Sequence, residues 1–363
     1  MRCAALSRVG FRMTAVDSLS MWVQASYVRR HIDQRLRKSG TVRQFNERIV
    51  DAVKREKPAF LWAEKQEYLS ADVLEEIRSR GTVTIHYNPD PYYSLSWKQT
   101  LHTDAALAAF DVLVVTKKYE VAEYQRRNRG TVVYSPLGFD PVGHRRTSGS
   151  SAKYRADISF VGGWEPRREE LLIAAMSPRR SIKVWGYGWT IAQQSVLNPL
   201  RAFRLGRLTN EQRPYFGPSR TELASMVQRE SEYNGEIYED AYSAAVASAA
   251  ISLGFLREIC PDQHTTRSFE IPAMGGFLLG NRSDEHLEFF EEGKEAEFFD
   301  STEEYIDKIN FYLANPALRC RIAEAGYRRC LSSGYSYDER LQKVLGEIGI
   351  APSPANALSY STL

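Results

Sequence analysis

The chain has 363 residues, of which 43% are hydrophobic, 12% aromatic and 26% charged. It is too apolar for a disordered protein and too long for one ordinary domain, so we expect two domains of about 150 to 200 residues. The 48 basic and 45 acidic residues leave a net charge of +3, and the arginine clusters are not interleaved with aromatic residues, which argues against nucleic acid as the main partner.

The cysteines and the hydropathy exclude further classes of protein. The four cysteines show no Cys-x-x-Cys or Cys/His spacing, so the sequence predicts no zinc site and no disulfide framework, and reduced thiols in a cytoplasm fit best. No apolar run approaches the roughly 20 residues of a membrane span, and the N-terminus has no signal-peptide core. We therefore expect a soluble, cytoplasmic protein without an integral membrane segment, while peripheral membrane contact stays open.

The first half of the chain alternates short apolar runs with helical periodicity, which is typical of a parallel sheet covered by helices. Residues 1–9 are expected to form a helix, and 11–16 a strand. Further strands are expected at 60–63, 83–87, 112–115 and 131–134, with a helix at 71–80. This pattern predicts a Rossmann-like domain over residues 1–143.

A polar stretch with no apolar member, 144–151, then predicts a linker over 144–155. After it the alternation restarts, which predicts a second Rossmann-like domain over 156–350. Strands are expected at 158–161, 182–185, 251–254, 277–280 and 297–299, with helices at 167–176, 238–247, 268–274, 301–314, from 316 onward and at 337–348. An insertion at 192–234 has no assigned role, and 351–363 are expected to be a flexible tail.

Paired glycines follow the first strand of the second domain. Gly162 and Gly163 stand between that strand and a helix opened by Pro166, so backbone amides and Arg167 are positioned to meet an anion. The alternative is an ordinary tight turn with solvated arginines.

The most informative segment lies further along, at the predicted short helix 268–274. Arg267 and Glu270 are three residues apart and share a helical face; the guanidinium suits a diphosphate, and the carboxylate suits the vicinal hydroxyls of a ribose. Gly275 and Gly276 close the helix against a buried strand. This combination indicates a nucleotide-sugar site, while the alternative for the Arg267 and Glu270 pair is a surface ion pair of a few tenths of a kcal/mol.

Two other positions are candidates with structural alternatives. Asp90 lies in a rigid turn, Asn-Pro-Asp-Pro, where it is placed to orient or deprotonate an acceptor hydroxyl, although turn chemistry explains the same residues. Tyr238 begins a helix that is positioned to border a nucleobase, with capping and packing as the default explanation.

The run 266–279, the segment Glu-Gly-Lys-Glu-Ala at 292–296 and the Ala-Glu-Ala-Gly helix at 323–326 resemble the bacterial CgeB-type (spore maturation protein) family of group 1 glycosyltransferases. The first half fits as well, through the Asn-Pro-Asp-Pro turn and the Ser-Pro-Leu-Gly-Phe-Asp-Pro segment at 135–141. The resemblance implies a GT-B fold, in which two Rossmann-like domains face a cleft, and a retaining mechanism.

The resemblance also implies roles for single residues. Glu270 matches the second of two glutamates eight residues apart, which holds the donor ribose. At the first position, to which the resemblance assigns contact with the sugar, the chain has Asp262, an acid one methylene shorter than the glutamate of the family. His264 and Thr265 lie between them and are candidates to face the donor sugar, with a surface loop as the alternative for each.

One departure from the family concerns the N-terminal domain, which usually opens with a strand and a glycine-bearing loop before the first helix. Here residues 1–9 already resemble that helix. Either the start codon is assigned too late or the sheet of this domain is shortened by its first strand.

We therefore expect a glycosyltransferase of hexosyltransferase type that moves a sugar from a nucleotide-sugar donor to a glycan, lipid-linked or protein acceptor. No Asp-x-Asp pair follows a strand, so we expect no metal and no other cofactor. Two alternatives stay open: a nucleotide-sugar epimerase on the same fold, and a catalytically silent nucleotide-sugar-binding protein.

Overall fold

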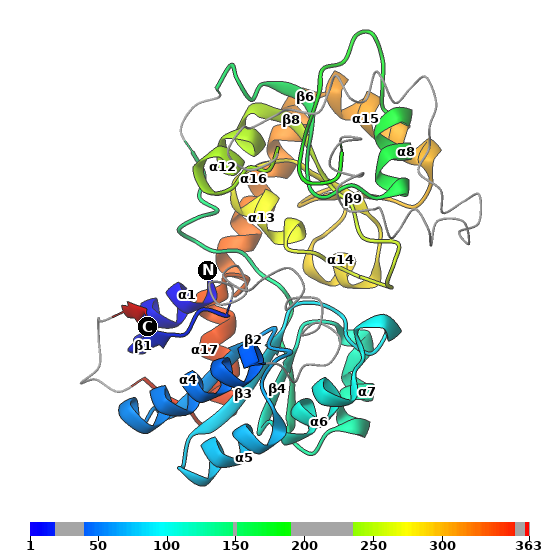
Figure 1. Ribbon diagram of the computed structural model, residues 1–363. Coiled ribbons are helices and arrows are strands. Elements are labelled where there is room, and N and C mark those ends of the chain that lie inside the picture. Colours follow the sequence, from blue (N-terminus) through cyan, green and yellow to red (C-terminus); the bar gives the residue numbers. More distant parts are fainter. Residues whose placement is uncertain (19–39, 148–150, 190–234, 353–359, 363) are drawn as a thin grey trace. The chain divides into compact units, whose positions relative to one another are not determined.

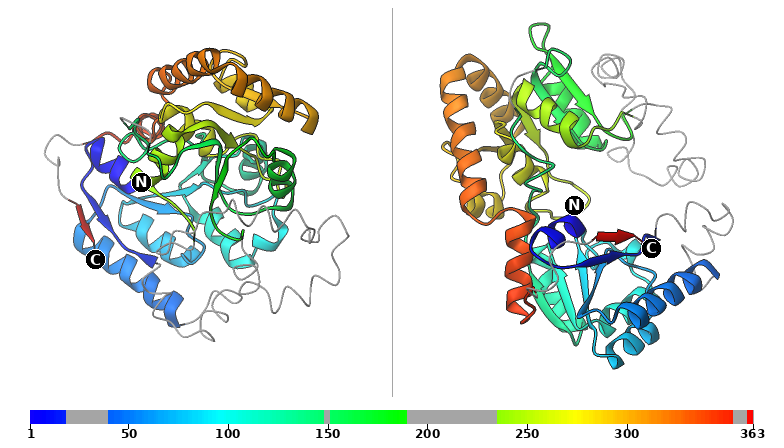
Figure 2. Two further views of the ribbon diagram at one scale, coloured as in Figure 1. Left: turned by 90° about the horizontal axis from the view of Figure 1, so that it is seen from above. Right: turned by 90° about the vertical axis from the view of Figure 1, so that its left-hand side faces the viewer.

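The computed structural model describes residues 1–18, 40–147, 151–189, 235–352 and 360–362. The chain forms two compact units, drawn as ribbons in Figure 1 and Figure 2. Unit 1 contains Met1–Leu137 together with Asp338–Leu363, so both ends of the chain contribute to it, and unit 2 contains Gly138–Tyr337. Each unit has its own parallel sheet and its own apolar core.

The main sheet of unit 1 has four parallel strands in the order β2-β3-β4-β5. The strands are β2 (Phe60–Glu64), β3 (Val83–Asn88), β4 (Val112–Val115) and β5 (Thr131–Tyr134). All of β4 is buried, as expected for an inner strand with both faces covered. The prediction of these strands is confirmed. No described strand pairs with the outer edge of β2 in this sheet.

Helices cover this sheet and one helix comes from the far end of the chain. They are α1 (Arg2–Arg8), α4 (Gly40–Glu56), α5 (Ala71–Ser79), α6 (Leu101–Ala109), α7 (Val121–Arg127) and α17 (Tyr337–Glu347), with short 3-10 turns η1 (Ser96–Lys98) and η2 (Lys118–Glu120). On α4, which the sequence prediction did not include, Phe45, Ile49 and Val53 recur every four residues and enter the core.

A second, smaller sheet corrects two expectations about unit 1. Strand β1 (Met13–Ala15) does not join the main sheet; it pairs in parallel with β11 (Tyr360–Thr362). The strand expected at 11–16 therefore has another partner than the Rossmann sheet, and the tail expected to be flexible over 351–363 contains a strand. Pairing of backbone N–H and C=O groups accounts for both, because each short segment satisfies the other.

The sheet of unit 2 has five parallel strands in the order β10-β9-β8-β6-β7. Their bounds confirm the predicted strands to within two residues: β6 (Ala156–Val161), β7 (Ile182–Trp185), β8 (Ala249–Gly254), β9 (Leu278–Asn281) and β10 (Glu297–Phe299). From β6 the chain crosses to β7 on one side, and from β8 it crosses to β9 on the other. The strand order thus reverses between β6 and β8, and ligands of doubly wound sheets bind beyond the carboxyl ends of the strands at such a point.

The helices of unit 2 are α8 (Pro166–Ala174), α12 (Glu239–Ser248), α13 (Arg267–Ala273), α14 (Asp284–Phe289), α15 (Thr302–Ala314) and α16 (Pro316–Ser332). Leu171 of α8 and Tyr305 of α15 pack with Phe160 and Leu253 of the sheet in one apolar cluster. Helices α12 and α13 contact β8 outside this cluster, and α15 and α16 lie side by side (Figure 2). Ser301 caps α15 by accepting the Glu304 amide at 3.1 Å.

The units divide the chain at other residues than the expected domains 1–143 and 156–350. Helix α17 joins unit 1, where Asp338 lies 2.6 Å from Arg8 and Leu341 is buried (Figure 1). The expected linker 144–155 is packed on unit 2 at its start, because His144 is buried there. Residues 148–150 of the linker and the whole of the expected insertion at 192–234 lie outside the described residues.

Candidate functional site

The backbone beyond β6 and β7 is closely packed. The Gly162 amide donates to the Trp185 carbonyl at 2.8 Å, and a Cβ on Gly186, whose φ is +139°, would lie 2.1 Å from the Gly162 carbonyl oxygen. A Cβ on Gly162 would lie 2.8 Å from the Phe160 ring and 3.3 Å from the Arg267 Cζ. Glycine at 162 therefore lets a guanidinium lie against the backbone at the end of β6.

Helix α8 begins with two adjacent arginines, and only the second contacts the turn that contains Gly162 and Gly163. Arg167, the predicted anion ligand, is partly exposed and donates to Glu170 at 3.0 Å and to Thr302 at 2.9 Å. Arg168 is 3% exposed and donates to the carbonyls of Gly163 at 2.9 Å and Leu256 at 3.4 Å. Through these two hydrogen bonds Arg168 connects the turn after β6 with the loop after β8.

Positive charge accumulates around Arg168. Its carboxylate neighbour is Glu165 at 3.2 Å, and the guanidinium of Arg267 lies near enough to act on it. Burial, and next the charge of Arg267, lower the pKa of Arg168 to about 10, while Glu165 acts in the opposite direction. Two guanidiniums thus lie close together at this end of the sheet, which favours an anion.

Helix α13 is short and its ends are fixed by its own sequence. At the start, the Ser268 hydroxyl accepts the Thr265 amide at 3.0 Å. At the end, Gly275 has a φ of +79°, the Gly276 amide donates to Ile271 O at 3.0 Å and the Gly275 amide to Pro272 O at 2.8 Å, which is a Schellman motif. Gly275 and Gly276 were predicted to bind the donor; the structure places them at the helix C-terminus, in a capping position.

Arg267 has donors available. Its Cζ lies 6.0 Å from the Phe160 ring centroid and beside Gly162. Among the described residues it makes no hydrogen bond or ion pair, and its buried Nε has no partner. A buried, unsatisfied donor is uncommon in folded proteins and calls for a partner that the described part of the chain does not supply.

Glu270 lies one turn later, and its carboxylate is almost fully buried. The Tyr242 hydroxyl of α12 donates to its Oε2 at 3.1 Å, and His144 Nε2 lies 3.7 Å from its Oε1. Burial and the charge of Glu270 raise the pKa of Tyr242, while Arg267 acts the other way, so Arg267 and Glu270 both lie near this hydroxyl. Sequence reasoning missed His144, because a polar stretch gave no sign that one member is buried.

The other predicted residues of this loop face into the protein. Asp262 is fully buried at its side chain and forms an ion pair with Arg257 at 2.8 Å. His264 is fully buried, with its Nδ1 2.6 Å from Glu285 Oε2 and Phe269 edge-on to its ring.

Thr265 and Tyr238 complete the predicted donor-binding residues. Thr265 is buried and its hydroxyl has no hydrogen-bond partner among the described residues. Tyr238 is 51% exposed at the N-cap of α12, where its side chain makes no capping hydrogen bond. The structure thus brings together Gly162, Arg267 and Glu270 and leaves Tyr238 at the surface.

In unit 1, Asp90 follows β3 and is held between two lysines. Its Oδ2 lies 2.5 Å from Lys65 Nζ and 3.8 Å from Lys98 Nζ. The segment that follows Asp90 is held by the buried carboxylate of Glu120, which accepts hydrogen bonds from the amides of Tyr92 at 2.8 Å and Ser94 at 2.8 Å. The position of Asp90 is therefore well defined, and its carboxylate is at the carboxyl end of the sheet.

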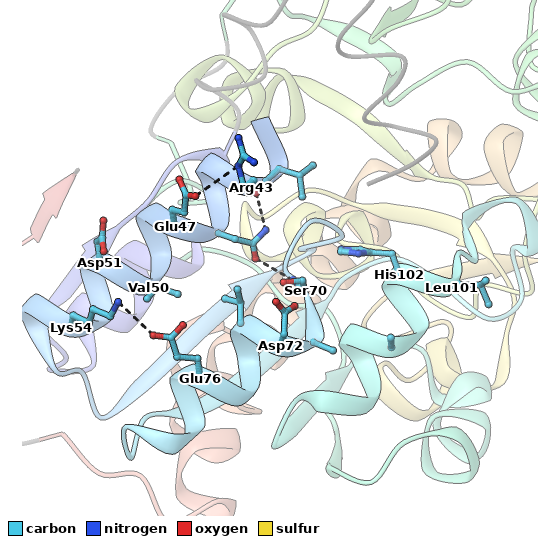
Figure 3. A pocket seen from close by; sticks show the side chains of 15 residues that line it. Arg43, Glu47, Val50, Asp51, Lys54, Ser70, Asp72, Glu76, Leu101 and His102 are labelled. Carbon is cyan, nitrogen blue, oxygen red and sulfur yellow. Dashed lines mark hydrogen bonds and ion pairs between the residues drawn. The ribbon is translucent and has the colours of Figure 1, made fainter. Parts of the chain in front are cut away.

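A cavity of about 830 Å³ lies elsewhere in unit 1, between α4, α5 and the start of α6 (Figure 3). Two ion pairs line it, Arg43 with Glu47 at 3.8 Å and Lys54 with Glu76 at 3.5 Å. None of the predicted site residues lines it. The described residues contain no group of three or more His, Cys, Asp or Glu side chains that could hold a metal ion, and none of their helices is long and apolar enough to cross a membrane.

Comparison with known proteins agrees with this fold. Residues 167–346 match a family model described as glycosyl transferase-like. No curated protein sequence matches the chain.

Solved structures are similar at low identity. HepE from Anabaena in complex with UDP and glucose has a TM-score of 0.58 and 11% identity, over 84% of this chain and 81% of that one. Sucrose-phosphate synthase from Thermosynechococcus elongatus has a TM-score of 0.56 and 15% identity, over 85% and 77%. The UDP-forming trehalose-phosphate synthase from Burkholderia vietnamiensis has a TM-score of 0.57 and 11% identity, over 96% and 83%. The chain has the GT-B fold of glycosyltransferases.

Proposed function

We propose that this protein is a glycosyltransferase that uses a nucleotide-sugar donor. It has the GT-B fold, and residues 167–346 match a glycosyl transferase-like family model. The observation that carries the proposal is Arg267, a guanidinium without a protein partner among the described residues, one helical turn from the buried carboxylate of Glu270. A diphosphate satisfies the first group and a ribose diol the second. Both lie beyond the carboxyl ends of strands at the point where the strand order reverses.

Charge stabilisation supports transfer as the reaction. As the bond between the sugar and the diphosphate breaks, negative charge grows on the leaving nucleoside diphosphate. Arg267, with Arg168 behind it, is fixed by packing before the reaction, so little reorganisation is needed when that charge appears. We propose that these guanidiniums, rather than a metal ion, neutralise the leaving group, and that the anomeric configuration of the sugar is retained, as the resemblance to group 1 enzymes implies.

Asp90 is our candidate for the acceptor side. In the proposed reaction its carboxylate orients the attacking hydroxyl, and the ion pairs with Lys65 and Lys98 hold it in place. The acceptor itself, whether glycan, lipid-linked or protein, has no recognisable determinant among these residues.

The test is a binding and turnover screen. Thermal shift and calorimetry with UDP, GDP, ADP and dTDP, each free and sugar-linked, are compared between wild type and Glu270→Ala; UDP is the first choice because the HepE structures contain it. We expect at least one nucleotide to bind wild type about tenfold or more tightly than the variant, since a hydrogen bond to a charged group contributes about 1.5–3 kcal/mol. Equal binding, or none, would contradict the proposal.

A silent nucleotide-sugar-binding protein is the second candidate, and Asp262 favours it. Its carboxylate is fully buried and neutralised by Arg257, so it offers no free acid at the position where the family has its first glutamate. Release of nucleoside diphosphate from the donor would exclude this candidate, and tight binding without turnover would support it. Formation of a sugar isomer without any acceptor would instead indicate an epimerase.

A further inference from the structure

The turn formed by residues 139–144 is fastened to unit 2 from several sides. The Phe139 amide donates to the Tyr335 carbonyl at 3.2 Å, and the Ser243 hydroxyl donates to the Gly143 carbonyl at 3.2 Å. Within the turn, the His144 amide donates to the Asp140 carbonyl at 2.8 Å. These bonds leave the backbone of His144 little freedom, so the direction of its side chain is set by the fold.

The hydrogen bonds also define which ring nitrogen of His144 carries the proton. The Asp140 amide donates to Nδ1 at 3.1 Å, which makes Nδ1 an acceptor. In the neutral ring the proton is then assigned to Nε2, which lies 3.7 Å from Glu270 Oε1. This distance is longer than a hydrogen bond, so His144 presents an N–H dipole to the carboxylate rather than a full bond.

Tyr242 supplies the direct bond to the same carboxylate. Its hydroxyl donates to Glu270 Oε2 at 3.1 Å, and its ring stands edge-on to the His144 imidazole with the centroids 5.8 Å apart. The three side chains are each at least nine-tenths buried and come from three separate segments of unit 2. A buried carboxylate is stable in its ionised form only where donors face it.

We propose that Tyr242 and His144 are positioning residues that hold the Glu270 carboxylate in the orientation in which it accepts the hydroxyls of the donor ribose. This inference rests on the proposed function. An ionised carboxylate has about four lone-pair directions, and Tyr242 takes one of them. The others remain for a vicinal diol, so the contribution of Tyr242 is expressed only through a ligand that has both hydroxyls.

Discrimination between ribose and deoxyribose follows as a measurable property. A site whose polar groups are set to bond a hydroxyl rejects an analogue that lacks it, because those groups are then left unpaired. We expect wild type to bind a ribonucleoside diphosphate at least about tenfold more tightly than its 2′-deoxy counterpart. Loss of the positioning groups should reduce this ratio, whereas a general disturbance of the fold would weaken both ligands alike.

Calorimetry on the full chain tests this inference. Wild type is first titrated with UDP, GDP, ADP and their 2′-deoxy counterparts to find the base that it binds best. The ribonucleotide and deoxynucleotide with that base are then compared among the variants. We expect Tyr242→Phe to weaken the ribonucleotide about tenfold and the deoxynucleotide less than about twofold. His144→Phe should lower the ratio in the same direction, and His144→Gln, which keeps an N–H near the position of Nε2, should restore part of it. Melting temperatures monitor folding.

Tyr305→Phe is the matched control, because Tyr305 is also a buried tyrosine of unit 2 and its hydroxyl has no partner among the described residues. It should leave both affinities unchanged. If Tyr242→Phe weakens both ligands equally, or neither, Glu270 is not positioned by Tyr242 and the inference is overturned while the proposed function stands. If wild type binds none of the nucleotides, the proposed function fails and the inference with it.

Discussion

Replacement of Arg267 should separate ligand binding from folding. Its guanidinium has no hydrogen bond or ion pair among the described residues, its Nε is buried, and the charge of Arg168 lies nearby. We therefore expect Arg267→Met to weaken nucleotide binding and to leave the free protein at least as stable as wild type. An arginine in a buried ion pair would behave in the opposite way, because its removal leaves a charge unpaired.

The expected magnitudes follow from these contacts. A buried donor without a partner disfavours the folded state by about 1–3 kcal/mol, and methionine removes it while keeping much of the apolar stem. The contact of Arg267 with the Phe160 ring opposes this by about 0.5–1 kcal/mol. The net gain is about 1 kcal/mol, or a rise in Tm of about 2–4 °C. Binding loses charge-assisted hydrogen bonds to the diphosphate, about 1.5–3 kcal/mol, which is roughly 10–150-fold in Kd.

Scanning fluorimetry and calorimetry with UDP measure both quantities on the same samples. Arg267→Lys, which keeps the charge but not the planar fork, should bind with intermediate affinity. The control is Arg328→Met, because Arg328 is exposed and pairs only at the surface with Glu324 at 3.0 Å. A Tm of Arg267→Met that falls by more than about 4 °C, together with an unchanged Kd for UDP, would refute the assignment of Arg267 as an unpaired ligand-binding group.

Three further perturbations test the fold and the acceptor side. Gly186→Ala should destabilise the protein by about 3 kcal/mol or more in urea unfolding, because its Cβ would lie 2.1 Å from the Gly162 carbonyl at a φ of +139°; Gly346→Ala, with nothing within 4 Å of its Cβ, should stabilise α17 by up to about 1 kcal/mol. Burial lowers the pKa of His86 from 6.5 to about 4, so the unfolded chain binds more protons than the folded chain between these pH values. The free energy of unfolding should therefore fall by up to roughly 3 kcal/mol as the pH drops from 6.5 to 4. If His86→Phe loses stability with pH to the same extent, the histidine is not the source of the loss. Asp90→Asn should lower the transfer rate about 100-fold without changing UDP affinity, and an equal loss of both would contradict a role at the acceptor.

The periodicity of the sequence was sufficient for most of the sheet. Strands 112–115 and 182–185 were predicted with their observed bounds. The first is an uninterrupted apolar run and the second is apolar except for Lys183, and such short runs between turn residues have few other ways to be buried. The partner of a strand is a different matter. Residues 13–15 pair with 360–362, and nothing local in either segment specifies a contact across the length of the chain.

Site residues could be predicted where the residue type and its spacing identify them, but not where their role depends on the direction of the side chain in the fold. Glu270 and Arg267 were found from a spacing that places both on one helical face. Arg167 and Arg168 are identical in type and adjacent, so only the packing of α8 on the sheet determines that the second is buried and the first is partly exposed. His144 was hidden for the same reason, since its burial depends on where residues 139–144 are fastened.

The discontinuity of unit 1 bears on how the polypeptide matures on the ribosome. Unit 2 is one uninterrupted segment, and its two ends are joined by the bonds of Phe139 with Tyr335 and Tyr337. Unit 1 stays unfinished until its last helix, α17, has been synthesised. The inserted half is therefore the part that can mature first during translation, and a gene fragment for residues 138–337 encodes the half suited to independent expression.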